Sequence, residues 1–181
     1  MEKNSTCLNF AGIEKIIDLI DQTDKGNQPI ILAIDGNSGA GKSYLADILA
    51  SCYDCNVFHM DDFFLQPHQR TEERFQEPGG NVDYERFKNE VINNLKRGAE
   101  FSYQVYDCNV ASLTEWINVT PKKLNIIEGV YSMHPLWNDI FDIKIFLTLQ
   151  LDLQLERIRE RNGEQMLKRF IQEWIPLENK Y

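Results

Sequence analysis

The sequence predicts an α/β fold in which a parallel sheet carries helices on both faces. Apolar, β-branched runs alternate with segments whose apolar residues recur at helical spacing. The first of these runs, 30–35, continues directly into Gly-x-x-x-x-Gly-Lys-Ser at 36–43, and a helix-like segment follows. Acidic residues follow two later runs. Because ligands bind at the carboxyl ends of parallel strands, these polar stretches are expected to meet at one site.

The elements are expected in the following order. An amphipathic helix at about 10–22 is predicted by apolar residues at helical spacing, namely Phe10, Ile13, Ile16, Ile17 and Ile20. Four buried strands are predicted at 30–35, 55–60, 124–128 and 143–149. The stretch 66–82, rich in polar residues, Pro and Gly, predicts an extended loop, and Asp83 can cap a helix to about Lys96. Helices are expected from about 150 to Tyr181.

Composition limits the classes of protein. A chain of 181 residues that is 43% hydrophobic can bury a real core, so one domain spanning 1–181 is expected. A net charge of −9 disfavours a nucleic-acid partner, because phosphate backbones are bound by surplus Lys and Arg. No apolar run is long enough for a bilayer and the N-terminus lacks a secretory signal, which predicts a cytoplasmic protein without a membrane partner. A homo-oligomer stays possible. Cys52 and Cys55 have C-x-x-C spacing without a second pair, so reduced thiols are expected rather than zinc.

The glycine-rich motif is a phosphate-binding P-loop. Glycines let the backbone curl so that successive N–H groups face phosphate oxygens, and the following helix adds positive charge at its N-terminus. Lys42 is expected at the β- and γ-phosphates, and the Ser43 hydroxyl at Mg²⁺. The chain is therefore expected to bind ATP with Mg²⁺, although the motif does not separate ATP from GTP. The expected nucleotide-binding residues are Gly36, Asn37, Ser38, Gly39, Ala40, Gly41, Lys42, Ser43 and Tyr44.

The acids after the second and third strands favour a small-molecule kinase. GTPase sequences of the type Asp-x-x-Gly and Asn-Lys-x-Asp are absent. Phosphoryl transfer needs in-line positioning and a carboxylate that accepts the hydroxyl proton. Asp61 ends a strand expected beside the P-loop strand and is a candidate for that proton. Glu128 is a candidate for holding Mg²⁺ or sharing the role of base, because a carboxylate after an apolar strand is costly to desolvate without a nearby cation.

These residues resemble the uridine kinase and phosphoribulokinase group, which also includes bacterial-type pantothenate kinase and nicotinamide riboside kinase. The resemblance spans about residues 30 to 170. It implies a P-loop NTPase three-layer sandwich with an acceptor loop at about 62–83 and a small helical lid at about 157–170. The matching stretches are Ile34 to Ser43, His-Met-Asp-Asp-Phe-Phe at 59–64, Tyr106-Asp107, Ile-Glu-Gly-Val-Tyr-Ser at 127–132 and Arg157 to Arg161.

The resemblance also implies roles for individual residues. Asp61 would be the acceptor-side carboxylate, and Phe63 or Phe64 would shape the acceptor pocket. Tyr106 would contact the acceptor. Arg157 and Arg161, which share a helix face at i and i+4, would close on the phosphates as lid residues. The weaker candidates are Arg169, for the lid or the acceptor, and Asp83, for sugar hydroxyls or simply the helix cap. The loop 70–84 and the residues after Tyr106 depart from the usual pattern of uridine kinases.

The sequence as a whole predicts a magnesium-dependent kinase that transfers the γ-phosphate of ATP to a hydroxyl of a small molecule. The first candidate acceptor is the 5′-hydroxyl of a nucleoside, as in uridine kinases. Pantothenate, nicotinamide riboside and a sugar phosphate stay open as acceptors. A nucleotide-binding regulatory ATPase module, which would use hydrolysis or occupancy as a signal, is the alternative from another class.

Overall fold

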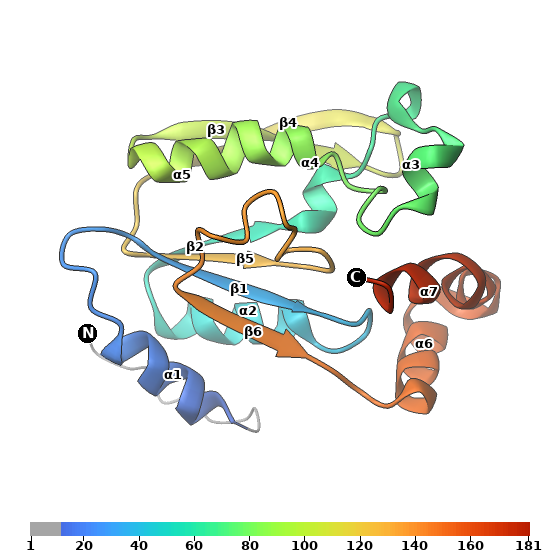
Figure 1. Cartoon of the computed structure of the whole chain (residues 1–181), viewed down its shortest axis with the longest axis horizontal. Helices are drawn as coiled ribbons and strands as arrows, with labels where there is room; N and C mark the ends of the chain where they lie inside the picture. The colour runs from blue at the N-terminus through green and yellow to red at the C-terminus, as the bar shows by residue number, and fades with distance from the viewer. Residues whose placement is uncertain (1–11) are drawn as a thin grey trace.

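A four-stranded parallel sheet forms the centre of the molecule, with helices on both faces (Figure 1). The computed structural model describes residues 12–181. The strands lie in the order β2-β5-β1-β6, so the chain crosses over between neighbours. Their bounds are Ile30–Gly36 for β1, Cys55–His59 for β2, Leu124–Glu128 for β5 and Ile143–Leu147 for β6. The alternation of strands and helices predicted this arrangement.

Two helices, α1 (Ile13–Gln22) and α2 (Lys42–Cys52), cover one face of the sheet. Helix α1 buries Ile13, Ile17 and Ile20, the stripe that predicted it. The first two residues of the predicted helix, Phe10 and its neighbour, lie outside the described residues. The buried side chains of α1 meet alternate residues of the strands, such as Leu32 and Ile34 of β1. Each fully buried Ile or Leu contributes about 1.5–3 kcal/mol, so this layer supplies much of the stability.

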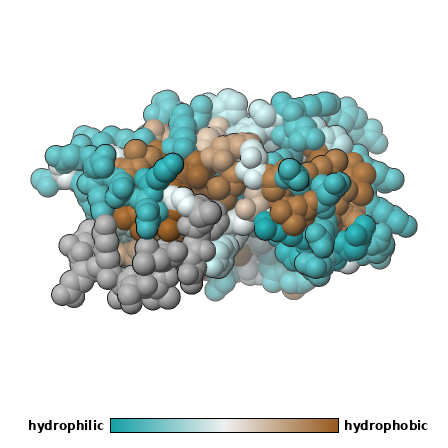
Figure 2. Space-filling view, turned by 90° about the horizontal axis from the view of Figure 1, so that it is seen from below, coloured by the Kyte–Doolittle hydropathy of each residue, from teal (hydrophilic) through white to brown (hydrophobic). Residues whose placement is uncertain are grey.

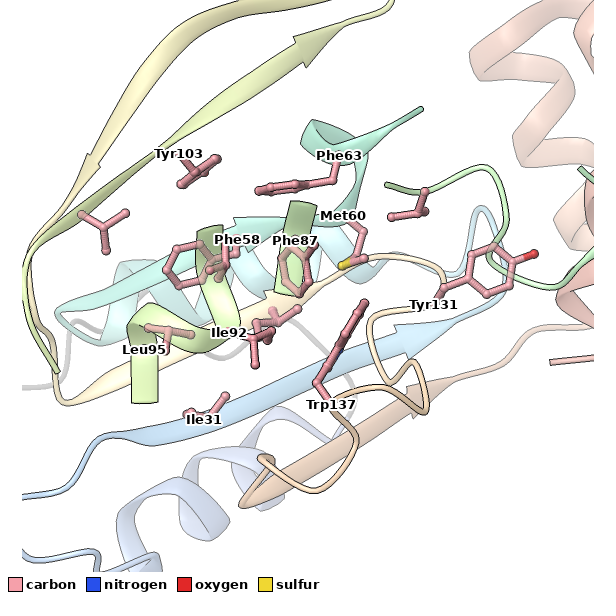
Figure 3. Packing of buried hydrophobic residues seen from close by; sticks show 14 residues of the cluster. Ile31, Phe58, Met60, Phe63, Phe87, Ile92, Leu95, Tyr103, Tyr131 and Trp137 are labelled. Carbon is pink, nitrogen blue, oxygen red and sulfur yellow. The ribbon is translucent and has the colours of Figure 1, made fainter. Parts of the chain in front are cut away.

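The opposite face is covered by one helical segment and a β-hairpin. The helix consists of α4 (Tyr84–Phe87), the π-helical turn η3 (Lys88–Ile92) and α5 (Asn93–Arg97). Asp83 caps it as predicted, because its Oδ1 accepts a hydrogen bond from the Arg86 backbone N–H at 3.0 Å. The hairpin consists of β3 (Phe101–Asp107) and β4 (Ser112–Val119). Figure 3 shows Phe58, Phe87 and Trp137 within the apolar cluster on this face, which the sheet, the helix and the hairpin enclose.

The predicted position of the second strand is wrong in one respect. Strand β2 does not pair with the P-loop strand β1, because β5 lies between them. Every residue of β5 is buried, whereas β2 buries only Phe58. A strand that is apolar on both faces is most stable inside the sheet, and a half-exposed one at its edge. Asp61 therefore reaches the P-loop from one strand further away.

The acceptor loop and the hairpin contain more regular structure than expected. The predicted extended loop, 66–82, holds the short helices η2 (Pro67–Gln69) and α3 (Glu72–Gln76), and the 3-10 helix η1 (Met60–Phe63) precedes it. The hairpin was not predicted. Its alternation is interrupted by a register shift between Gln104 and Tyr106, and its second strand leaves Trp116 60% exposed. A strand with a bulge and a largely exposed partner gives a weak period-2 signal.

The end of the chain is helical, as predicted. It consists of α6 (Leu151–Arg169), the π-helical turn η4 (Phe170–Trp174) and α7 (Ile175–Glu178). Helix α6 breaks at Gly163, whose φ of 78° and ψ of 170° lie outside the helical region and favour glycine. A small separate core of Ile158, Leu167, Phe170 and Ile175 holds the pieces together. Viewed from below, apolar surface gathers at this end of the molecule (Figure 2), where Leu151, Leu153 and Ile171 are exposed.

The structure bears on two sequence-based expectations, the absence of a membrane-spanning run and the reduced state of the thiols. Within residues 12–181, no helix is both long enough and apolar enough to cross a membrane. The thiols of Cys55 and Cys108 are free, but Cys52 is disulfide-bonded, so the expectation of reduced thiols is wrong at this residue.

Candidate active site

The P-loop lies where β1 passes into α2, as the motif predicts. Gly36 has a φ of 134°, and a Cβ atom at this position would lie 2.0 Å from the backbone oxygen of Leu147 in β6. Only glycine allows the two strands to approach this closely. Gly41, with a φ of 94°, then starts helix α2. The loop is therefore shaped by backbone geometry that no other residue type accommodates.

A cleft of about 1260 Å³ opens above this loop. It is lined by the predicted nucleotide-binding residues Ser38, Gly39, Gly41, Lys42, Ser43 and Tyr44. The other predicted P-loop residues, Gly36, Asn37 and Ala40, are not part of the lining, and they shape the loop through backbone contacts. The predicted catalytic residues Asp61, Glu128, Arg157 and Arg161, and also Arg169, line the same cleft.

Lys42 is nearly buried and lies at the centre of the acidic groups. Its Nζ donates hydrogen bonds to the backbone oxygens of Gly36, at 2.9 Å, and Asn37, at 3.0 Å. Burial lowers the pKa of the Lys42 ammonium group, and surrounding carboxylates oppose this effect. In decreasing order of their effect, these carboxylates are Glu128, Glu178, Asp35 and Asp61. The carboxylates therefore favour the charged form of Lys42, which is the form that can bind an anionic ligand.

Glu128 connects the P-loop with β2. The register of the sheet places His59 directly opposite Glu128, whose side chain is 6% exposed. The His59 Nδ1 lies 2.6 Å from Glu128 Oε1, and the Ser43 hydroxyl donates to the same oxygen at 3.1 Å. The hydrogen bond with Glu128 raises the pKa of His59, and burial opposes it. Sequence reasoning did not foresee this contact of His59, because it depends on strand register.

A hydroxyl and a carboxylate in contact fit the way proteins hold Mg²⁺ beside a nucleotide. Mg²⁺ prefers oxygen ligands and keeps several waters, so one or two protein oxygens and the substrate phosphates suffice. Ser43 and Glu128 provide these oxygens at the mouth of the P-loop. The described residues contain no group of three or more His, Cys, Asp and Glu side chains placed to enclose a metal.

The two neighbouring aspartates of η1, Asp61 and Asp62, face different parts of the molecule. Asp61 faces the cleft, where burial and then the Glu128 carboxylate raise the pKa of its carboxyl group. Lys42 and Arg161 oppose this rise. Asp62 instead faces the hairpin and accepts a hydrogen bond from the Tyr103 hydroxyl at 3.3 Å. Asp61 is therefore the member of the pair that can meet a ligand.

One part of the cleft, called the acceptor compartment here, is lined by residues of the predicted acceptor loop. Its lining combines apolar and polar side chains. The apolar ones are Phe64, Leu65, Phe75 and Val82, and the polar ones are Arg70, Gln76 and Asn81. Arg70 was not predicted, because nothing in a polar loop distinguishes one arginine. Its Nη2 donates to the Tyr106 hydroxyl at 2.6 Å, and its Nε to the Leu65 oxygen at 3.1 Å.

Three predicted acceptor residues do not line this compartment. Phe63 is fully buried against Phe87, with ring centroids 4.9 Å apart, and its neighbour Phe64 faces the cleft instead. Tyr106 is 3% exposed and lies behind Arg70. Asp83 is also 3% exposed, and its carboxylate accepts from Gln69 Nε2 at 2.8 Å as well as from the helix. The position of Asp83 favours the helix cap over contact with sugar hydroxyls.

The three lid arginines extend along one side of the cleft. Arg157 Nη1 donates to the Gly39 backbone oxygen at 3.0 Å, which connects α6 with the P-loop. Arg161 lies close enough to Asp61 to lower its pKa. Arg169 is held by Glu173, at 3.0 Å, and its guanidinium lies 5.0 Å from the centre of the Trp174 ring. All three residues are exposed.

Comparisons with known proteins test the family resemblance and the fold. No protein-family model matches the chain. A uridine kinase of Clostridium perfringens is 24% identical over 175 residues, covering 85% of this chain and 81% of its own. The uridine kinase of Escherichia coli strain K12 is 27% identical over 156 residues, covering 77% and 71%.

Solved structures show the same fold. A proposed fructose transport system kinase from Silicibacter sp. TM1040 has a TM-score of 0.72 at 21% identity, covering 92% of this chain and 89% of its own. A possible uridine kinase from Bacillus stearothermophilus has a TM-score of 0.62 at 22% identity, covering 88% and 94%. At this identity the likeness establishes the fold alone. The predicted fold and resemblance are confirmed: the chain has the P-loop NTPase fold and is similar in sequence to uridine kinases.

Proposed function

We propose that this protein is an ATP- and magnesium-dependent kinase that phosphorylates a hydroxyl of a small molecule, with a nucleoside as the first candidate. The observation that carries the proposal is the cleft itself. Lys42 of the P-loop and Asp61 line the same cavity, and apolar and polar residues of the acceptor loop line it as well. A nucleotide-binding loop, a carboxylate and room for an acceptor are the parts that phosphoryl transfer requires.

Each side chain has a role in this proposal. The P-loop amides and Lys42 bind the β- and γ-phosphates, and Ser43 and Glu128 hold Mg²⁺. Bound Mg²⁺ supplies neutralisation of phosphate charge. Asp61 orients the acceptor hydroxyl and accepts its proton. Arg157 and Arg161 approach the phosphates from the lid and exclude water.

Asp61 is a better candidate than Glu128 for the base. The Oε1 of Glu128 is already engaged by Ser43 and His59, at 3.1 Å and 2.6 Å. Within residues 12–181 the Asp61 carboxylate accepts no hydrogen bond from another residue, and burial raises its pKa. A free carboxylate with a raised pKa is the stronger proton acceptor.

A nucleoside is favoured as acceptor by two lines of support. The curated relatives are named uridine kinase, and they cover 77–85% of this chain. The acceptor compartment also combines the apolar side chains of Phe64 and Phe75 with polar groups, including Arg70. Planar, polar rings are suited to such a lining. Pantothenate, nicotinamide riboside and a sugar phosphate are the other acceptors to be tested.

The proposal is tested by measuring ADP release from ATP with each acceptor and with none. We expect release that depends on one acceptor class, nucleosides first. Asp61→Asn should abolish turnover with little change in ATP affinity. The matched control is Asp62→Asn, which changes the neighbouring carboxylate that faces the hairpin and should keep turnover. Acceptor-independent ATP hydrolysis would favour a regulatory ATPase module, and normal turnover in Asp61→Asn would refute the role of that carboxylate.

A further inference from the structure

The last residues of the chain contact the P-loop directly. Figure 1 shows the end of the chain returning to the edge of the sheet where β1 ends. There the Ser38 backbone N–H donates to Glu178 Oε2 at 3.0 Å, and the Ser38 hydroxyl donates to Glu178 Oε1. One carboxylate therefore uses both donors of a P-loop residue that lines the cleft.

Three more contacts hold this segment, 175–181, in place. The Tyr181 hydroxyl donates to Asp35 Oδ2 at 3.0 Å, and the Tyr181 ring meets Tyr131 edge-on, with centroids 5.0 Å apart. Asp35 is fully buried at the end of β1. The Gln154 side chain of the lid helix approaches the Glu178 carboxylate at 3.4 Å. The segment is thus bound to the P-loop, the sheet and the lid at once.

Glu178 occupies a backbone N–H group of the P-loop, where such a loop binds anions. Ser38 is the third residue of the Gly-x-x-x-x-Gly-Lys-Ser motif. Backbone N–H groups in such a loop are recognition groups for phosphate oxygens, and a carboxylate is an anion with the same preference for N–H donors. Two anions that share one donor in a partly buried site repel each other strongly. Glu178 also lies close enough to Lys42 to affect its charge equilibrium.

We propose that the segment 175–181 is an internal competitor for the phosphate site: Glu178 occupies Ser38 as an anion, and a nucleoside triphosphate binds when this carboxylate withdraws. The inference depends on the proposed nucleotide binding at the P-loop and adds its regulation. When Glu178 withdraws, the bond between Tyr181 and Asp35 and the bond between Gln154 and Glu178 also break. Because Gln154 belongs to the lid helix, nucleotide binding is coupled to movement of the lid. The ligand class recognised is a nucleoside with a polyphosphate chain.

The test compares nucleotide affinities by calorimetry in the full chain. Glu178→Gln removes the competing charge, and we expect ATP to bind about tenfold more tightly. This is the gain expected when one charge-assisted contact no longer stabilises the state in which residue 178 is bonded to Ser38. Affinity for adenosine, which carries no phosphate, should not change. Glu164→Gln is the matched control, since it removes an exposed carboxylate of α6 that pairs with Arg159 outside the cleft.

Two further measurements distinguish competition by Glu178 from a folding defect or a general effect of charge. Tyr181→Phe removes only the hydroxyl that bonds Asp35 and should tighten ATP binding in the same direction, by less. Hydrogen exchange of the wild-type protein should show faster exchange in 175–181 when ATP is added. Unchanged or weaker ATP affinity in Glu178→Gln, or greater protection of 175–181 with ATP, refutes the competition while leaving nucleotide binding intact. Absence of ATP binding in the folded wild-type and both variants would overturn the proposed function as well.

Discussion

The acceptor loop depends on a single side chain, and Arg74→Met tests that dependence. Arg74, in α3, donates to the backbone oxygens of Gly80, at 3.2 Å, and Val82, at 3.0 Å. It forms a two-pronged ion pair with Glu85, at 3.0 and 2.8 Å. Its guanidinium also lies 3.6 Å from the centre of the Tyr84 ring. Methionine keeps the apolar stem and removes every one of these polar contacts.

The expected loss follows from these contacts. The two bonds to backbone oxygens are worth about 1 kcal/mol each. The ion pair adds only about 0.5 kcal/mol, because the Glu85 side chain is 55% exposed. The contact with the Tyr84 ring adds about 0.5–1 kcal/mol. Arg74→Met should therefore lower the free energy of unfolding, measured by urea denaturation, by about 3 kcal/mol.

The same change should act on one substrate only. Phe75, Gln76, Asn81 and Val82 belong to this loop and line the acceptor side of the cleft, whereas ATP is expected at the P-loop. We expect the KM for the acceptor to rise about tenfold or more, with the KM for ATP within about twofold, because the loop no longer holds the acceptor compartment in shape. Limited proteolysis should cut the variant within 66–83 faster than the wild-type protein.

Glu85→Gln is the matched control, since it weakens the ion pair and leaves the bonds to the backbone oxygens in place. It should cost about 0.5 kcal/mol and leave the acceptor KM nearly unchanged. A loss below about 1 kcal/mol in Arg74→Met, or equal changes in the KM of both substrates, would refute the reasoning that this arginine organises the loop.

Three further predictions concern the P-loop side of the cleft. Asp61→Asn should raise the free energy of unfolding at pH 7. Folding raises the pKa of Asp61 above its ordinary value of 3.8, so the stability of the wild-type protein falls as the pH rises above 3.8. Urea denaturation should therefore show that the variant is more stable at pH 7 and not more stable below pH 3.8. Gly36→Ala should cost about 3 kcal/mol or prevent folding, since its Cβ would lie 2.0 Å from the Leu147 oxygen; an unchanged Tm contradicts this. Arg161→Ala should lower kcat about 100-fold without changing Tm, and an unchanged kcat would exclude the lid arginine from the reaction.

Local signals account for what the sequence determined. The strand, loop and helix from Ile30 to Cys52 follow from an apolar run, glycines with positive φ and a helical stripe, all within about twenty residues. The same holds for the cap at Asp83 and for the acids that follow β2 and end β5. From these the fold and the P-loop could be predicted, because each signal is complete in a short segment. The acceptor-side role of Asp61 and the lid stay predictions.

Tertiary structure alone decided which of these groups meet. Whether Asp61 or Asp62 faces the cleft depends on how η1 is packed against the hairpin, and His59 meets Glu128 only through strand register. The contacts of Glu178 with Ser38 and of Tyr181 with Asp35 join residues 140 and 146 positions apart. No pattern within a few residues encodes such pairs, since they form only when the sheet and the two helical layers have packed.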